Sequence, residues 1–284
     1  MTLLTRVEPI DLHQPVLIIS LDGWIDAGEG SALARRALLD RDVTPAATAD
    51  ADALFDHRAR RPTLHIDDGV ATHLDWPQLR IDLVDDDRSR DVLLLHGAEP
   101  DHAWHAFIDE VVAFALDSGV GMVVGLGAYP AATPHTRPSR LSCTASTPEL
   151  IDRFAFTRAS IEVPAGIQAA IEHALHQRGV PAIGLWAQVP HYLTGISYPE
   201  AAAALLDGLD GVAGRRFDTT DLREQAIGTR NRIDRLIDDN AEHMQMLHQL
   251  EAGYDAQSQA DDGPLPSGDD LAAEFQAFLR DQDD

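Results

Sequence analysis

Short apolar runs alternate with segments of helical spacing along most of the chain. The first run, residues 16–21, leads into a turn-rich segment and then into an Ala- and Leu-rich helical stretch that reaches Arg41. The further predicted strands are residues 79–84, 91–95, 120–126, 141–145 and 182–189. The further predicted helices are residues 101–117, 165–177 and 199–209. This alternation predicts an α/β fold with a mostly parallel sheet that helices cover on both faces.

A long charged segment follows this predicted core. Thr219 or Thr220 is suited to cap a helix that begins at Asp221, and apolar residues then recur at helical spacing as far as Tyr254. Gly228 marks a potential break in this helix. We expect the helix to pack along its own α/β domain. Pairing with a neighbouring subunit is the alternative, although the segment lacks the sustained heptads of a coiled coil.

Three regions follow from these patterns. Residues 1–217 form the predicted α/β domain, and residues 218–256 form a helical extension. Residues 257–284 are predicted to contain an acidic linker and a short amphipathic helix. Three alternatives are open for that last helix: it binds a groove on another molecule, it docks on its own chain, or it is disordered.

Polar side chains gather just beyond the predicted strands. In an open α/β sheet the carboxyl ends of the strands form the crevice where ligands bind, and proline stiffens the loops that build it. The strands at 120–126 and 182–189 each lead to a Pro-His step. The candidate binding residues at this edge are Asp26, Glu99, Asp101, Trp104, His135, Arg137, His191 and Tyr192. We therefore predict that loops far apart in the sequence meet along one rim.

Three of these residues are the catalytic candidates. Arg137 is suited to hold a carboxylate, and His135 or His191 is suited to move a proton. The structural alternative is that these side chains satisfy carbonyls and carboxylates within loops stiffened by proline. No serine or cysteine lies in a nucleophile-elbow pattern, so no covalent mechanism is predicted and no catalytic residue is assigned.

The acidic candidates have structural interpretations as well. Asp26 is placed to cap a helix, and the glycines that follow it lack the third glycine of a dinucleotide fingerprint, so no cofactor is predicted. Asp101 is expected at the positive end of a helix that Trp104 anchors to the sheet. His102 and His105 lie three residues apart without the His-Glu-x-x-His pattern, so no metal site is predicted.

The charged residues of the chain limit the classes of molecule that it is expected to bind. The formal net charge of −25 argues against binding to nucleic acid or to an anionic membrane, because an acidic surface repels phosphate. All 22 basic residues are arginine, which excludes a Schiff-base lysine and a P-loop lysine. Arg60 and Arg61 belong to the densest basic cluster, and we expect them to pair with carboxylates of the same chain.

Cysteine usage and hydropathy indicate the compartment. Cys143 is the only cysteine, so neither an internal disulfide nor a thiolate metal cluster is possible within one chain. The first residues lack the pattern of a signal peptide, and no run approaches the ~18 apolar residues of a membrane span. We expect a cytoplasmic protein.

Several short motifs occur one after another between residues 10 and 256. They are Gly23 to Gly28, Phe55-Asp56 with Arg58 to Pro62, Gly97 with Glu99 to Asp101 and Trp104, Pro134 to Pro138, Val189 to Tyr192, and Leu250-Glu251 with Tyr254-Asp255. As a set they resemble the PAC2 (proteasome assembly chaperone 2) family in its actinobacterial branch. The resemblance implies a three-layer αβα core of phosphorylase/hydrolase-like type, a helical C-terminal addition, and homo-oligomers that are often trimers.

The resemblance also bears on function. No enzymatic activity is tied to the family, and its eukaryotic and archaeal members assist proteasome assembly. Some members that engage proteasomes end in a hydrophobic-Tyr-x motif, which residues 280–284 lack, so the resemblance does not extend to docking of that kind. The leading hypothesis is a non-catalytic, homo-oligomeric binding protein of chaperone type, whose partners are its own copies and proteasome-related or other protein subunits. The alternative is a hydrolase or ligase-type enzyme that acts on a carboxylate- or amide-bearing small molecule at the strand-end crevice.

Overall fold

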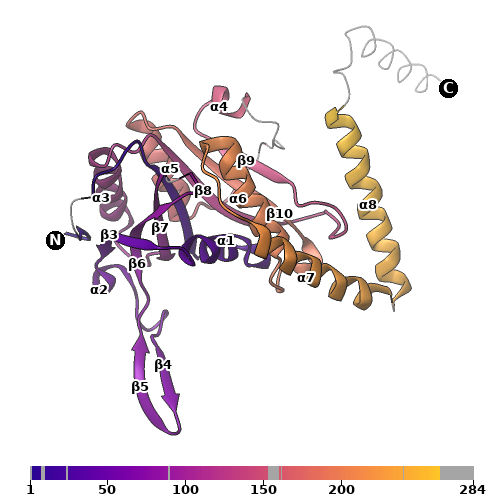
Figure 1. Cartoon of the computed structure of the whole chain (residues 1–284), viewed down its shortest axis with the longest axis horizontal. Coiled ribbons are helices and arrows are strands. Elements are labelled where there is room, and N and C mark those ends of the chain that lie inside the picture. Colours follow the sequence, from indigo (N-terminus) through magenta and orange to yellow (C-terminus); the bar gives the residue numbers. More distant parts are fainter. Residues whose placement is uncertain are drawn as a thin grey trace.

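A mixed eight-stranded sheet forms the centre of the structure (Figure 1). The computed structural model describes residues 2–7, 10–23, 25–88, 90–152, 160, 162–238 and 240–262. In spatial order the strands are β1 (Leu4–Arg6), β3 (Val43–Ala49), β6 (Leu79–Asp85), β7 (Asp91–Ala98), β2 (Val16–Asp22), β8 (Met122–Ala131), β10 (Ala182–Pro190) and β9 (Leu141–Ala145).

The four middle strands, β7, β2, β8 and β10, run parallel, and the outer pairings are antiparallel. Strands buried on both faces need apolar side chains at successive positions, and β2 supplies them from Val16 to Ile19. The parallel register pairs Val16 with Val92 and with Met122, so the carboxyl ends of these strands open at the same edge.

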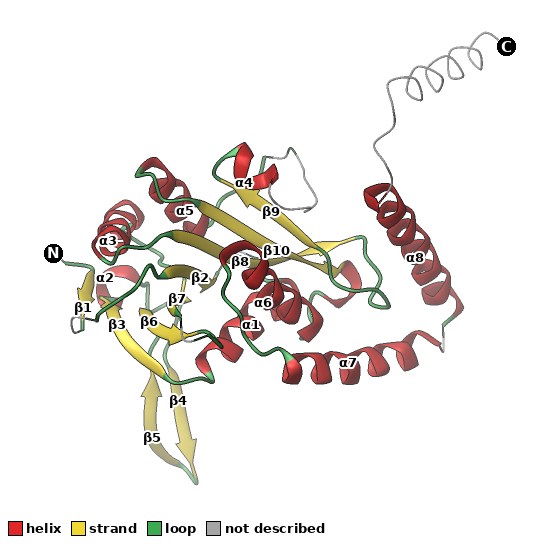
Figure 2. Ribbon diagram, turned by 45° about the horizontal axis from the view of Figure 1, so that its top comes forward, coloured by secondary structure: helices red, strands yellow, loops and turns green. Residues whose placement is uncertain are grey.

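Helices cover both faces of the sheet (Figure 2). One face packs against α1 (Gly30–Leu39), α6 (Pro199–Ala213) and α7 (Thr220–Asp238), and the other against α3 (Trp104–Asp117) and α5 (Ile167–Gln177). The short helices α2 (Ala51–Leu54) and α4 (Pro148–Asp152) complete the described core. Alternate residues of β2 enter opposite layers, because side chains of a strand alternate between its faces. The predicted three-layer α/β core is confirmed.

A two-stranded hairpin of β4 (Thr63–Asp67) and β5 (Val70–Asp75) projects from this core (Figure 1). Its turn residues Asp68 and Gly69 have φ angles of 44° and 79°, the paired positive values of a type I′ turn. The strand predictions omitted this hairpin, although an Asp-Gly step between alternating apolar residues is a strong hairpin signal.

The helical extension consists of two helices, α7 and α8 (Ala241–Asp262). The predicted break at Gly228 is wrong, because α7 continues through it and ends at Asp238. The Asn240 side chain accepts hydrogen bonds from the backbone N–H groups of Glu242 and His243, and this cap starts α8. Helix α8 extends to Asp262, so six residues of the predicted acidic linker are helical, and the predicted last amphipathic helix lies outside the described residues.

Helix α7 packs on its own α/β domain, as expected. Leu222, Ile233 and Ile237 are buried in the same apolar cluster as α1 and α6. Within the described residues, every helix is too short or too polar to cross a membrane.

Candidate functional site

His135 lies in the loop that follows β8, and its imidazole is fully buried. Tyr192 Oη lies 2.8 Å from His135 Nδ1 and accepts the His135 backbone N–H at 3.0 Å. On the other side of the ring, Nε2 lies 2.9 Å from Asp234 Oδ1 on α7. This pattern places hydrogen on Nε2 and a lone pair on Nδ1, directed at the tyrosine hydroxyl. Both ring nitrogens are therefore occupied: Nε2 joins the loop to α7, and Nδ1 joins it to Tyr192.

Arg137 makes the corresponding connection to α8. Its Nε and Nη2 donate to the two carboxylate oxygens of Asp255 at 2.9 and 2.8 Å, and its Nη1 donates to Glu251 at 3.2 Å. The guanidinium of Arg140 lies 3.9 Å from the ring centroid of Tyr254. Hydrogen bonding to Arg137 lowers the pKa of Asp255. We call Arg137, Arg140, Glu251, Tyr254 and Asp255 the α8 clamp.

We predict that Arg137→Ala releases α8 from the body of the protein. The substitution removes a bidentate ion pair and leaves α8 held by the other clamp contacts and by Leu247, its one residue buried in the core among the described residues. Amide hydrogen exchange within α8 is expected to accelerate by about tenfold, while exchange in β2 is unchanged. Arg178→Ala is the matched control, because Arg178 is exposed and has no ion-pair partner among the described residues. Unchanged exchange in α8 would show that the clamp is not what holds it.

Two acidic candidates cap helices. Asp26 accepts the backbone N–H groups of Ser31 and Ala32 at 2.7 and 2.9 Å at the start of α1. Burial raises the pKa of Asp26, and these two hydrogen bonds oppose the rise. Glu99 accepts the Ile167 N–H at 2.7 Å at the start of α5, and so joins the end of β7 to that helix.

Asp101 lies outside the helix in which the sequence pattern placed it, whereas Trp104 begins that helix and packs against the core. The predicted helix start at residue 101 is wrong, because α3 begins at Trp104. Asp101 instead accepts the Asp56 backbone N–H at 3.0 Å and pairs with Arg60 at 3.1 Å, which confirms the predicted internal pairing of Arg60. Trp104 Nε1 donates to the Pro100 carbonyl at 2.6 Å.

The eight candidates therefore do not share one environment. His135, Tyr192 and His191 are joined by ring contacts, with His191 exposed and 5.3 Å from Tyr192 between ring centroids. Of these, His135 contacts α7, whereas Arg137 contacts α8. Asp26 and Glu99 cap helices of opposite layers, and Asp101 binds the loop after α2.

A second set of residues, of which the sequence analysis predicted only Glu99, lies beside the end of β2 and over β8 and β10. The crevice there is lined by Leu21, Ile25, Glu99, Leu126, Gly166, Gln168, Ala169 and Trp186. It shares Gly166, Ala169 and Trp186 with a larger cavity of about 460 Å³ along α5. This cavity is also lined by Thr144, Ala145, Ser146, Val163, Pro164, Ala165, Glu172, His173, His176 and Ala182.

Glu172 is the unusual residue of this cavity. It is 9% exposed, and its Oε1 has no hydrogen-bond partner among the described residues. Its carboxyl lies on the sheet over Gly125, where a Cβ would come within 1.9 Å of Oε1. Burial raises the pKa of Glu172 to about 7, and the nearby Gln168 amide opposes this rise. Glycine within a strand often marks such a close approach, and Gly125 and Gly184 were the available sequence signal.

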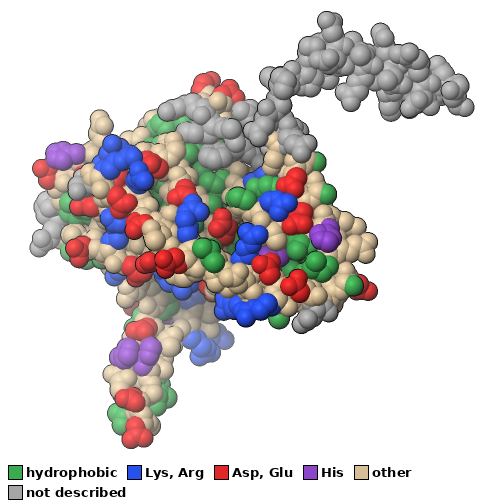
Figure 3. Space-filling view, turned by 45° about the vertical axis from the view of Figure 1, so that its right-hand side comes forward, with side chains coloured by type: hydrophobic (Ala, Val, Ile, Leu, Met, Phe, Trp, Pro, Cys, Tyr) green, Lys and Arg blue, Asp and Glu red, His purple; other side chains and the backbone are tan. Residues whose placement is uncertain are grey.

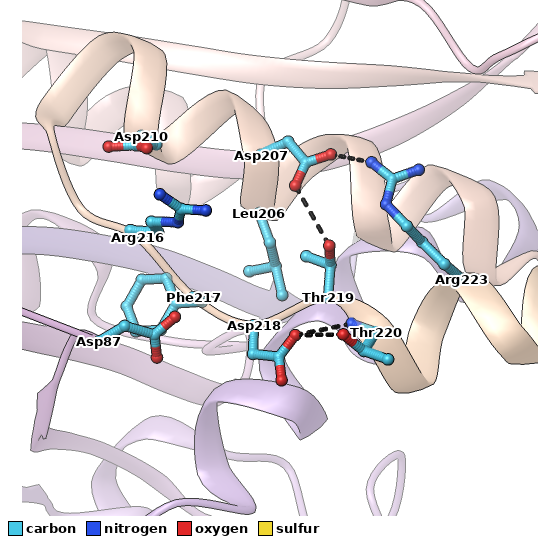
Figure 4. Close-up of a pocket in the computed structure, with 10 residues that line it drawn as sticks. All are labelled: Asp87, Leu206, Asp207, Asp210, Arg216, Phe217, Asp218, Thr219, Thr220 and Arg223. Atoms are coloured by element: carbon cyan, nitrogen blue, oxygen red, sulfur yellow. Dashed lines mark hydrogen bonds and ion pairs between the residues drawn. The ribbon is translucent and has the colours of Figure 1, made fainter.

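Two other groups of polar residues lie apart from these sites. A hollow of about 800 Å³ between α6 and the start of α7 contains mostly paired groups: Asp207 binds Thr219 and Arg223, and Asp218 binds Thr220 (Figure 4). His65, His73 and Asp75 form the only group of metal-ligand type found among the described residues. It is partly to fully exposed, on the β4–β5 hairpin.

Several solved structures are similar to this chain in both fold and sequence. A Mycobacterium tuberculosis protein of unknown function is 34% identical, with a TM-score of 0.85, and the match covers 91% of this chain and 92% of that one. A proteasome-assembly chaperone homologue from the same organism is 32% identical, with a TM-score of 0.74, over 82% of this chain and 99% of the other. A PAC2 family protein from Streptomyces avermitilis is 34% identical, with a TM-score of 0.73, over 82% and 99%.

The same family emerges from the sequence itself. No curated protein matches the chain. The profile of the PAC2 family matches residues 20–237, which run from the end of β2 almost to the end of α7. This chain is a member of the PAC2 family.

Proposed function

We propose that this protein is a non-catalytic, homo-oligomeric binding protein of the assembly-chaperone type. Family membership supports the proposal, and so does the 32% identity to a proteasome-assembly chaperone homologue. Such a protein covers a partner's assembly surface until another subunit competes for it.

The projecting β4–β5 hairpin is the observation that carries this proposal. Isolated two-stranded hairpins are marginally stable, and large exposed apolar side chains on one surface mark interaction sites. Figure 3 shows hydrophobic side chains on the hairpin beside histidines and acidic residues. The apolar side chains, which are 47–64% exposed, are Leu64, Ile66, Val70, Leu74 and Trp76. A second copy of this chain, pairing with the open hairpin edges, is the proposed first occupant.

Ile66→Asp is expected to shift the protein toward the monomer. Ile66 is 63% exposed, so an aspartate there costs the folded monomer little and places a charge in the proposed contact. Size-exclusion chromatography with light scattering measures the mass. The control is Ile227→Asp on α7, which introduces the same change at a side chain that is also 63% exposed. A monomeric wild-type protein, or equal masses for both variants, would contradict the role of the hairpin.

Partner capture tests the chaperone aspect separately. Affinity purification of the full chain from its native host is expected to recover a specific protein subunit, which Ile66→Asp reduces and Ile227→Asp leaves unchanged. A companion chain that ends at Asp262 keeps the whole of α8 and the α8 clamp, and so tests residues 263–284 alone. Failure to recover any reproducible partner would overturn the chaperone proposal.

The catalytic candidates named for the enzymatic alternative give it weaker support. His135 uses both ring nitrogens internally, and Arg137 is paired with two carboxylates of α8. A proton acceptor needs a free lone pair directed at substrate, and an anion-binding arginine needs free donors.

A further inference from the structure

The β4–β5 hairpin presents two imidazoles and a carboxylate on one of its faces. His65 of β4 is paired directly with His73 of β5, and Asp75 follows His73 by two residues, so all three side chains share a face. The neighbouring cross-strand pair, Leu64 and Leu74, lies on the opposite face. One potential ligand atom from each of the three polar side chains lies within 4.8 Å of the other two.

These three side chains converge on one point. The two imidazole rings are stacked, with 3.9 Å between their centroids and 6° between their planes. Asp75 Oδ2 lies 2.7 Å from His65 Nε2, and Asp75 Oδ1 lies 3.9 Å from His73 Nε2. In a tetrahedral zinc site with bonds of about 2.0–2.2 Å, neighbouring ligand atoms are roughly 3.3 Å apart. Small rotations of these side chains therefore suffice to bring the three atoms to that spacing.

The hydrogen bonds of Thr72 prepare His73 to bind a metal. Thr72 Oγ1 donates to the His65 carbonyl at 3.2 Å, so its oxygen accepts the hydrogen of His73 Nδ1 at 3.3 Å. The lone pair of His73 is then on Nε2, the nitrogen that faces Asp75. Metal-binding histidines are usually oriented by such a hydrogen bond from the second ring nitrogen. At His65, a metal ion replaces the hydrogen between Nε2 and Asp75.

The ligand types select the class of metal. Two imidazoles with one carboxylate suit Zn²⁺ and related transition-metal ions, whereas Mg²⁺ and Ca²⁺ prefer oxygen ligands. Three protein ligands leave one position of a tetrahedral site for water or another donor. That position is open to solvent here, because the three side chains are 42–64% exposed.

We propose that the β4–β5 hairpin binds one Zn²⁺ ion per chain through His65, His73 and Asp75. The ion links β4 to β5 and stabilises a hairpin that would be marginal by itself. All three ligands come from one chain, so the site does not require the self-association proposed above. Either proposal can therefore fail alone.

Isothermal titration of the full chain with ZnCl₂, after removal of bound metal with EDTA, tests this site. The wild-type protein is expected to bind one Zn²⁺ per chain, and His65→Ala and His73→Ala are each expected to weaken binding at least tenfold. Asp75→Asn keeps the side-chain shape and is expected to weaken binding as well. His105→Ala is the matched control, because His105 is an exposed histidine of α3 outside this group. Mg²⁺ is expected to bind at least tenfold more weakly than Zn²⁺.

Hydrogen exchange separates metal binding from an ordinary surface contact between histidine and aspartate. Saturating Zn²⁺ is expected to slow amide exchange in β4 and β5 at least tenfold, to leave β2 unchanged, and to have no such effect in His73→Ala. The substituted side chains are partly to fully exposed, so the variants are expected to keep the circular dichroism spectrum of the wild-type protein. Absence of Zn²⁺ binding to the wild-type protein, equal binding by both alanine variants, or hairpin exchange that Zn²⁺ does not change would each overturn the proposal.

Discussion

Gly97→Ala is expected to destabilise the protein by about 3 kcal/mol or more. Gly97 has a φ of 118°, a conformation that residues with a Cβ rarely adopt, and a Cβ there would lie 2.0 Å from the Gln78 carbonyl oxygen. That carbonyl accepts the Ala98 N–H at 2.9 Å where β6 approaches β7. The clash is with backbone, so it must separate the two strands. Urea unfolding followed by circular dichroism measures the loss.

A second glycine isolates this effect. Gly121 has no atom within 4 Å of a built Cβ and does not adopt a positive φ. Gly121→Ala is therefore expected to change the free energy of unfolding by less than about 0.5 kcal/mol. Gly97 also precedes Glu99, the residue that joins β7 to α5, so its substitution is expected to loosen the crevice. Equal stabilities of the two variants would contradict the steric argument.

The stability of the wild-type protein relative to Glu172→Gln is expected to fall by about 3 kcal/mol as the pH rises from below 4.5 to above 7. Because burial raises the pKa of Glu172 from 4.5 to about 7, the folded chain holds this proton more tightly than the unfolded chain does. The contribution of Glu172 is therefore fully present below pH 4.5 and is lost as the pH rises through about 7.

Urea unfolding of both chains at several pH values tests this dependence. His173 and His176 line the same cavity in both chains, so their contributions largely cancel in the difference. The uncharged amide of Glu172→Gln keeps the side-chain shape and removes the titration. A difference between the two chains that stays constant with pH would show that Glu172 is solvated in solution.

Several elements were predictable because their signals are local. The apolar runs at residues 16–19 of β2 and 182–187 of β10 specify strands buried on both faces, and the helical spacing of α5 and α6 specifies one buried face each. The alternation of these elements was sufficient to predict the three-layer core. The hairpin has a local signal as well, because Asp68 and Gly69 form an Asp-Gly turn between alternating apolar residues.

The contacts of the candidate site residues could not be predicted from the sequence. The pattern placed His135, Arg137 and Glu99 correctly beyond the ends of strands. It could not show that His135 meets Asp234, 99 residues away, or that Arg137 meets Asp255. Helical spacing alone also could not show that Glu172 is buried against the sheet instead of exposed on the surface of α5.

By itself, the order of apolar and polar residues determined the central strands, the helices that cover them and hence the layered core, because backbone geometry and burial of one face act between near neighbours in the chain. Only the tertiary structure decided which polar groups find partners. The α8 clamp and the unpaired Glu172 depend on how α7, α8 and α5 are placed against distant loops and strands. That placement is the summed result of packing across the whole molecule, which no short segment encodes.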